Sequence, residues 1–109
     1  MNTDIQSLTP QQLQQWQQEQ RSFVLLDVRE DEETAICRLN GSRHIPMHLI
    51  PLRHNELPDG LPIVVYCHHG IRSLQVARFL AHTGFEQLYN LSGGIDAWSL
   101  HIDPHTPRY

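Results

Sequence analysis

Short apolar runs alternate with amphipathic segments along this chain. Residues 23–26 and 61–66 form almost continuous apolar runs, which are typical of strands covered on both faces, and residues 87–91 form a third strand-like run. After its first turn, the segment 72–83 is strongly polar on one narrow stripe only, which predicts a mostly buried helix. Strands that alternate with helices predict a parallel sheet with helices on both faces, and ligands then bind beyond the carboxyl ends of the strands.

Local signals place the first helix and the end of the long one. Thr9 offers an N-cap hydroxyl, Pro10 occupies the first helical position, and Gln12 completes a capping box. A helix is therefore expected to begin at Pro10 and to run through the Gln-rich segment 11–20, whose glutamines face solvent. Gly84 is expected to end the helix that covers residues 72–83.

The remaining predicted elements are shorter. An acidic start and an apolar end predict a short helix over residues 31–37, which Gly41 is expected to end. Prolines interrupt the segment 47–57, which is expected to be a loop with a helical turn. A last short helix is expected over residues 95–100.

Composition is that of one small soluble domain. The chain has 109 residues and 39% of them are hydrophobic, so a single domain 1–109 is expected, with its core in about residues 5–100 and a tail 101–109 on the surface. The net charge of −4 and the lack of a basic cluster disfavour a nucleic-acid partner. Residues 1–4 do not begin a secretory signal, and no apolar window is long enough to cross a membrane, so a cytoplasmic location is expected.

All eight basic residues are Arg, and this absence of Lys excludes reactions that depend on a Lys amine. A nucleotide site with a phosphate-binding loop and a Schiff-base cofactor site both need a Lys amine, so both are excluded. The two cysteines, Cys37 and Cys67, are too few for a disulfide framework, and their thiols are expected to be reduced.

Cys67 has the sequence setting of a reactive thiol. It directly follows the predicted strand 61–66 and precedes a short loop and a helix. Gly70 lets the loop curl so that successive N–H groups point at one spot, and Arg72 adds a cation; both features lower the pKa of a thiol. Cys37 lies in a short helix without such a loop and is expected to be a packing residue.

Several of these segments together resemble the rhodanese (sulfurtransferase) family. Residues 64–84, VVYCHHGIRSLQVARFLAHTG, are similar to its active-site loop and the helix that follows. Residues 27–30 (DVRE), 41–46 (GSRHIP) and 92–98 (SGGIDAW) resemble three further landmarks of that family, in the same order. The resemblance implies an α/β, rhodanese-like fold: a central parallel sheet of about five short strands, flanked by helices on both faces.

The resemblance also implies a sulfurtransferase with Cys67 as the catalytic residue. Cys67 would take a sulfane sulfur from a small donor anion such as thiosulfate, or from a persulfide, and hold it as a covalent persulfide without any cofactor. It would then pass the sulfur to a thiol, cyanide or protein acceptor. The implied substrate-binding loop consists of His68, His69, Gly70, Ile71, Arg72 and Ser73.

The same resemblance assigns supporting roles to residues outside or at the end of the loop. The amides of residues 68–72 are expected to stabilise the negative charges of the donor and the persulfide. Asp27 is expected to pair with Arg72, and Arg29 is expected to hold that network or to meet the substrate anion. His44 is expected to pair with a nearby acid.

Two other functions stay open from the sequence. Related cysteine phosphatases and arsenate reductases have a longer loop, whereas four residues separate Cys67 from Arg72 here, which suits sulfur better than a tetrahedral phosphate. A noncatalytic partner-binding module of the same fold is the second alternative, although such modules typically lack the cysteine. The ending of the chain also resembles rhodanese domains fused to adenylyltransferases, which points to a protein acceptor.

The eight histidines are expected to form no metal site. Pro46 argues against a helix that presents His44 and His48 together, and the neighbours His68 and His69 are expected to point in different directions. Many thiosulfate-using relatives carry Arg or Lys where these two histidines stand. The loop is therefore expected to gain positive charge only as the pH falls through about 6.5.

Overall fold

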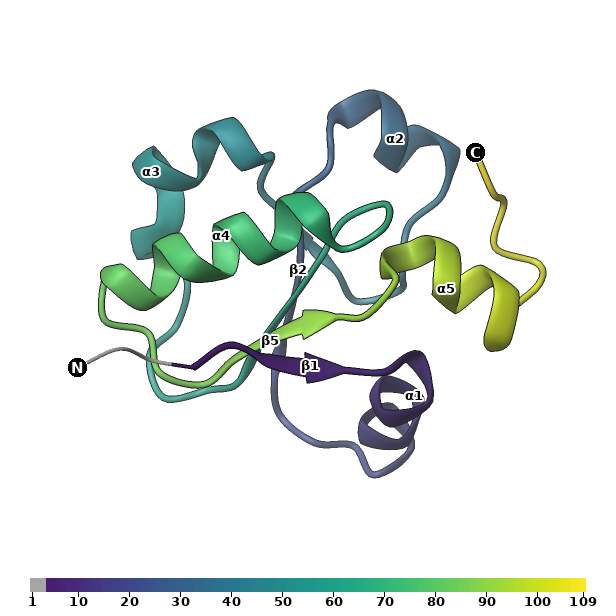
Figure 1. Cartoon of the computed structure of the whole chain (residues 1–109), viewed down its shortest axis with the longest axis horizontal. Coiled ribbons are helices and arrows are strands. Elements are labelled where there is room, and N and C mark those ends of the chain that lie inside the picture. The colour runs from purple at the N-terminus through teal and green to yellow at the C-terminus, as the bar shows by residue number, and fades with distance from the viewer. Residues whose placement is uncertain (1–3) are drawn as a thin grey trace.

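The computed structural model describes residues 4–109; the prediction about a secretory signal concerns residues 1–4 and so lies largely outside them. The strands are β1 (Gln6–Leu8), β2 (Val24–Asp27), β3 (Arg43–His44), β4 (Ile63–Tyr66) and β5 (Leu88–Leu91). The helices are α1 (Pro10–Gln18), α2 (Asp31–Ile36), α3 (Ile50–Arg53), α4 (Ile71–His82) and α5 (Gly94–His101), and 3-10 turns η1 (Met47–Leu49) and η2 (His54–Glu56) flank α3. Figure 1 shows their arrangement.

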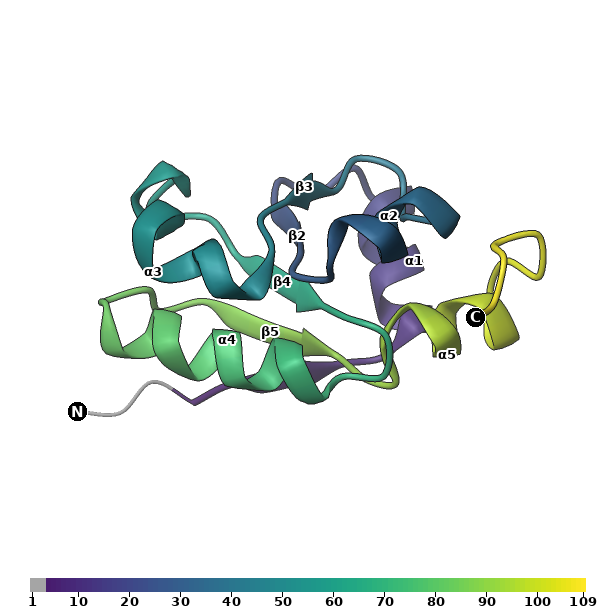
Figure 2. The same cartoon turned by 90° about the horizontal axis from the view of Figure 1, so that it is seen from above.

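The five strands form one sheet in the order β1-β5-β4-β2-β3, and every pair in it is parallel. The carboxyl ends of β2 and β4 therefore lie side by side, with Asp27 in register with Tyr66. In Figure 2, α4 lies alongside β5 and β4. The predicted α/β architecture, a parallel sheet of five short strands, is confirmed.

Two hydrophobic cores cover the two faces of the sheet. One core joins the sheet to α3 and α4 and includes Leu26, Ile63, Val65, Ile50, Val76, Ala77 and Leu80. The other joins the sheet to α1 and α5 and includes Leu25, Val64, Tyr66, Leu13, Trp16, Ile95 and Trp98. Because successive strand residues point to opposite faces, the unbroken apolar run of β4 serves both cores.

The helix ends follow their sequence signals in most places. Thr9 and Gln12 form the predicted capping box at the start of α1. In α4 the predicted polar stripe is exposed, and Gly84 follows the helix with a φ of +106°. The predicted end of α2 was wrong: the helix ends at Ile36, five residues before Gly41, which instead occupies a later turn.

Within residues 4–109, no helix is both long enough and apolar enough to cross a membrane.

Candidate active site

Cys67 lies where β4 ends and the loop toward α4 begins, with only 1% of the residue exposed. Its Sγ accepts hydrogen bonds from the amides of Gly70 (3.1 Å) and Ser73 (3.4 Å) and lies 3.3 Å from the Ser73 hydroxyl. Burial alone raises the pKa of this thiol, but the hydrogen bonds from Ser73, Gly70 and His69 outweigh it and hold the pKa below the ordinary value. The site therefore favours a thiolate.

The loop keeps its curled shape through Gly70 and through a residue that sequence reasoning missed. Gly70 has a φ of +107°, a left-handed conformation that a side chain disfavours, and it precedes the first residue of α4. Asn90, near the end of β5, donates to the Gly70 carbonyl (3.0 Å) and accepts from the Ser73 hydroxyl. The sequence signal for Asn90 was its polar amide side chain in an otherwise apolar strand.

Arg72 holds the loop to α2 rather than to β2. Its guanidinium forms a two-pronged ion pair with Glu33, with distances of 2.6 and 2.8 Å. The predicted partner, Asp27, is wrong because two other groups occupy that carboxylate. Glu33 belongs to the acidic first turn of α2, which the sequence explained only as a helix-end preference.

Arg29 holds the network beneath the loop and is 0% exposed, so the expectation that it meets a substrate anion is wrong. It binds both carboxylate oxygens of Asp27, at 2.9 and 2.7 Å, and donates to the Cys37 carbonyl. Tyr66 donates a further hydrogen bond to Asp27 (2.8 Å). Burial disfavours the charge of Arg29, yet its hydrogen bonds to Asp27 and Tyr109 raise its pKa above the usual range. His44 lies 3.8 Å from an Asp31 oxygen, as expected.

The Glu33 and Arg72 pair makes stability depend on pH. Hydrogen bonds from Arg72 lower the pKa of Glu33 to about 2, below about 4.3 in an unfolded chain. The pair therefore stabilises the fold fully above about pH 4.5 and loses this effect as the pH falls toward 2. We expect Glu33→Gln to lower the free energy of unfolding by about 1–3 kcal/mol at pH 7 and by almost nothing near pH 2.

Urea unfolding of the Glu33→Gln variant at several pH values measures this effect. Glu32→Gln is the matched control, because Glu32 is the exposed neighbour on the same helix. An equal loss at pH 7 and near pH 2 would contradict the assigned pair.

The start of α5 supports the loop from its other side. The amides of Ile95 and Asp96 donate to the carbonyls of Cys67 (3.0 Å) and His68 (3.1 Å). Gly94 permits this approach, since a Cβ there would lie 2.5 Å from the Cys67 carbonyl oxygen. The Gly-Gly motif of residues 93 and 94 thus sets the distance between α5 and the loop.

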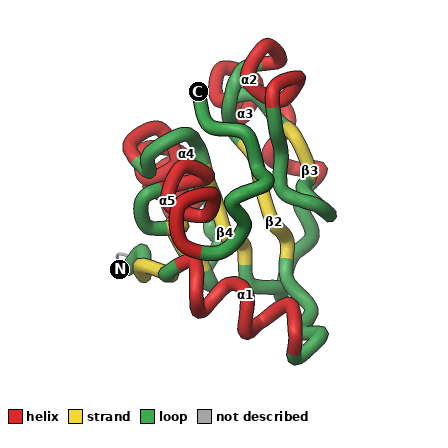
Figure 3. Tube along the Cα trace, turned by 90° about the vertical axis from the view of Figure 1, so that its right-hand side faces the viewer, coloured by secondary structure: helices red, strands yellow, loops and turns green. Residues whose placement is uncertain are grey.

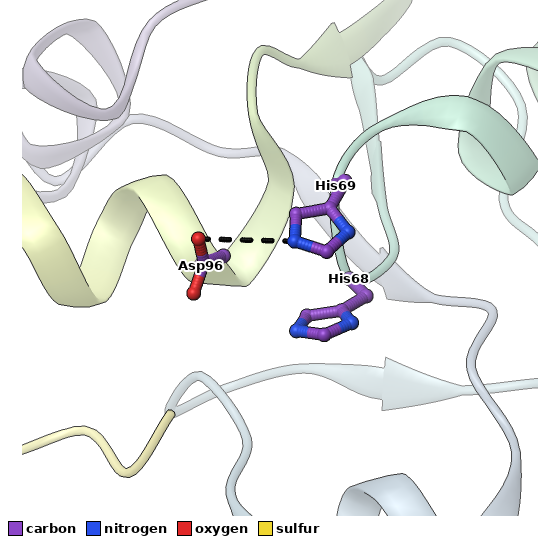
Figure 4. Close-up of side chains that lie close together, drawn as sticks. All are labelled: His68, His69 and Asp96. Carbon is purple, nitrogen blue, oxygen red and sulfur yellow. Dashed lines mark ion pairs between the residues drawn. The ribbon is translucent and has the colours of Figure 1, made fainter. Parts of the chain in front are cut away.

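His68 and His69 point to the same side, so the expectation that they diverge was wrong (Figure 4). Their rings stack with centroids 3.9 Å apart, because the curled loop lacks the side-chain alternation of an extended strand. His69 Nε2 lies 3.8 Å from an Asp96 oxygen. Burial, together with the nearby charge of His69, lowers the pKa of His68, so this ring gains its charge at a lower pH than the sequence predicted.

His68, His69 and Asp96 present ligand atoms within 4.8 Å of one another, which is the spacing of a metal-binding cluster. One feature opposes a shared ion: Arg108 already binds the Asp96 carboxylate at 2.8 and 3.3 Å. The cluster is therefore better suited to shaping the loop than to ligating a metal.

Comparison with known proteins identifies the family. The model of the rhodanese-like domain matches residues 9–101. The chain is 35% identical over 95 residues to the thiosulfate sulfurtransferase GlpE of Haemophilus influenzae, which covers 86% of this chain and 88% of that protein. It is 32% identical over 105 residues to the probable adenylyltransferase/sulfurtransferase MoeZ of Mycobacterium tuberculosis, covering 94% of this chain and 27% of that longer protein.

Solved structures agree with this assignment. A rhodanese-like domain protein from Staphylococcus aureus superimposes with a TM-score of 0.83 at 30% identity, over 96% of this chain and 99% of that one. With the fold, the ordered motifs and a family match over most of its length, this chain belongs to the rhodanese-like domain family.

Proposed function

We propose that this protein is a sulfurtransferase in which Cys67 carries the transferred sulfur. One observation supports this above the others: two backbone amides and the Ser73 hydroxyl converge on Cys67 Sγ inside a four-residue loop between a buried strand and a helix. Such a cradle stabilises a thiolate and, after sulfur uptake, the negative charge of a persulfide. Relatives with sulfurtransferase activity in their names support the same reaction class.

The proposed reaction has two displacement steps. The Cys67 thiolate attacks the outer sulfur of thiosulfate or of a persulfide, a new S–S bond forms, and sulfite or a thiolate leaves with the electron pair of the broken bond. A nucleophilic acceptor then attacks the outer sulfur of the Cys67 persulfide and restores the Cys67 thiolate. Cyanide leaves as thiocyanate in this second step, and a thiol leaves as a persulfide. No net oxidant or reductant is consumed.

The loop residues have different roles in the proposed reaction. The amides of His69, Gly70 and Ser73 stabilise charge on sulfur, while Arg72 holds the loop through Glu33. Ile71 is 73% exposed at the start of α4, where an incoming acceptor can contact it. The MoeZ relative, which combines such a domain with an adenylyltransferase, makes a protein acceptor a second candidate beside small thiols.

Intact-protein mass spectrometry tests the proposal directly. After incubation with thiosulfate, or separately with an alkyl persulfide, the protein should gain the mass of one sulfur atom. Cyanide should remove it, and peptide mapping should place it on Cys67. The absence of an adduct with both donors would exclude the proposed intermediate, whatever the acceptor.

A further inference from the structure

The tail that follows α5 returns to the active-site loop, although it was expected to lie simply on the surface. A turn organised by Asp103 redirects the chain: its carboxylate accepts from the His105 amide (3.0 Å) and the Thr106 hydroxyl (3.2 Å). Figure 3 shows the tail passing from α5 toward α2, and Figure 1 shows its end close to α2. The tail therefore runs beside the Cys67 loop from one helix to the other.

Two side chains anchor this tail. Arg108 forms a two-pronged ion pair with Asp96 at the start of α5. The Tyr109 hydroxyl donates to a Glu33 oxygen (2.7 Å) and accepts from Arg29 (2.9 Å). Tyr109 thus shares the carboxylate that holds Arg72, so the tail is part of the support of the loop.

The ring of Tyr109 lies flat on His68. Their centroids are 3.9 Å apart with an interplanar angle of 8°, and His69 stacks on His68 at the same centroid distance. His68 Nε2 is buried without a hydrogen-bond partner. A protonated ring would bury an unpartnered N–H and a charge, so this position favours the neutral form.

Charged groups face His68 from each packed element. Asp96 on α5 and Glu33 on α2 favour its protonation, whereas His69 in the loop and Arg72 on α4 oppose it. The guanidinium groups around the loop are already paired within the described residues: Arg72 with Glu33, Arg29 with Asp27, and Arg108 with Asp96. A donor with two negative charges that approaches the loop therefore meets these three guanidinium groups with their charges already compensated.

We propose that Tyr109 is a positioning residue that holds His68 flat beside the loop and Glu33 against Arg72, so that the site selects sulfur donors of low negative charge, such as alkyl persulfides, over thiosulfate. The donor preference rests on the proposed function. The effect of Tyr109 on the charge of His68 beside the loop can be measured without any sulfur transfer.

The test compares alkylation of Cys67 by iodoacetate, an anion, with alkylation by neutral iodoacetamide between pH 8 and pH 6. The Cys67 thiolate attacks the CH2 carbon of either reagent and displaces iodide, so the ratio of the two rates cancels the thiolate fraction and reports local charge. The background is Cys37→Ser. The variants are Tyr109→Ala, Tyr109→Phe, which keeps the ring without its hydroxyl, and His105→Ala, an exposed tail residue, as the matched control.

In Tyr109→Ala, the freed His68 should gain its charge near its ordinary pKa. The rate ratio should then rise about three- to tenfold more than in the unsubstituted background as the pH falls from 8 to 6, the effect of one added charge near the thiolate. Tyr109→Phe and His105→Ala should follow the background, in which His69 keeps whatever charge it carries. Adding His68→Asn to Tyr109→Ala should remove the rise.

Two outcomes would overturn the proposal. The first is a ratio in Tyr109→Ala that rises no more than in the background, and the second is an additional rise that survives His68→Asn, which would place the charge on another group. Alkylation needs no sulfur donor, so either outcome is independent of the persulfide experiment. The proposed function is tested by the persulfide experiment alone. Matching unfolding midpoints of the variants show that the fold is retained.

Discussion

Cys67→Ser is expected to lower sulfur transfer from thiosulfate to cyanide by at least about a thousandfold, because loss of a covalent nucleophile removes the reaction path itself. A serine hydroxyl stays protonated near neutral pH and does not attack sulfane sulfur. The cradle of amides from Gly70 and Ser73 remains, so the loss reflects chemistry and not collapse of the loop. Thiocyanate formation measures the rate.

Cys37→Ser is the matched control for this prediction. Cys37 is also buried, at 8% exposure, but it lies after α2 in a hydrophobic core, and its Sγ accepts a long hydrogen bond from Arg29 at 3.9 Å. We expect this variant to keep most of its sulfur transfer. If Cys67→Ser retained more than a few per cent of the activity, or if Cys37→Ser lost it equally, Cys67 would not be the sulfur carrier.

Gly94→Ala is expected to have the largest effect on stability among single methyl additions. Gly94 has a φ of +63°, and a Cβ there would overlap the Cys67 carbonyl oxygen and, more closely still, the His68 carbonyl oxygen. These contacts are with backbone that the Ile95 and Asp96 amides hold in place, so no flexible side chain can yield. We expect a loss of about 3 kcal/mol or more in the free energy of unfolding, from strain and overpacking together.

Gly41→Ala isolates the backbone part of that loss. Gly41 has a similar φ of +80° but no atom within 4 Å of the added carbon, so only about 1 kcal/mol is expected. Urea unfolding compares the two variants, and persulfide formation by Gly94→Ala should fall as the loop shifts. Equal losses in both variants would show that α5 yields and that the close approach does not position the loop.

The parts of the fold with strong local signals were predictable from the sequence. The apolar runs of β2 and β4 and the stripe of α4 carry enough periodicity to identify them. The edge strands β1 and β3 were missed because they lack the apolar runs of the central strands. Most of their residues are exposed and polar, including Gln6, Ser7 and Arg43. Their pairing depends on neighbours that are distant in sequence.

The candidate site was predictable where adjacent residues define it and not where tertiary pairing does. Cys67 and its loop follow from a strand, a glycine and a helix in direct succession. The choice of Glu33 over Asp27 as the partner of Arg72 depends on the competing bond from Arg29, which no spacing reveals. The stacking of Tyr109 on His68 likewise arises only when the tail returns.

The strand order has a consequence for the way in which this protein is made. β1 pairs with β5, so Gln6 cannot pair until Tyr89, about eighty residues later in the sequence, has been synthesised. Such distant pairing is slow to form, and a nascent chain without β5 has neither a complete sheet nor the Ile95 and Asp96 amides beneath the Cys67 loop. The Cys67 loop therefore gains its support from α5 only after β5 and the start of α5 have left the ribosome.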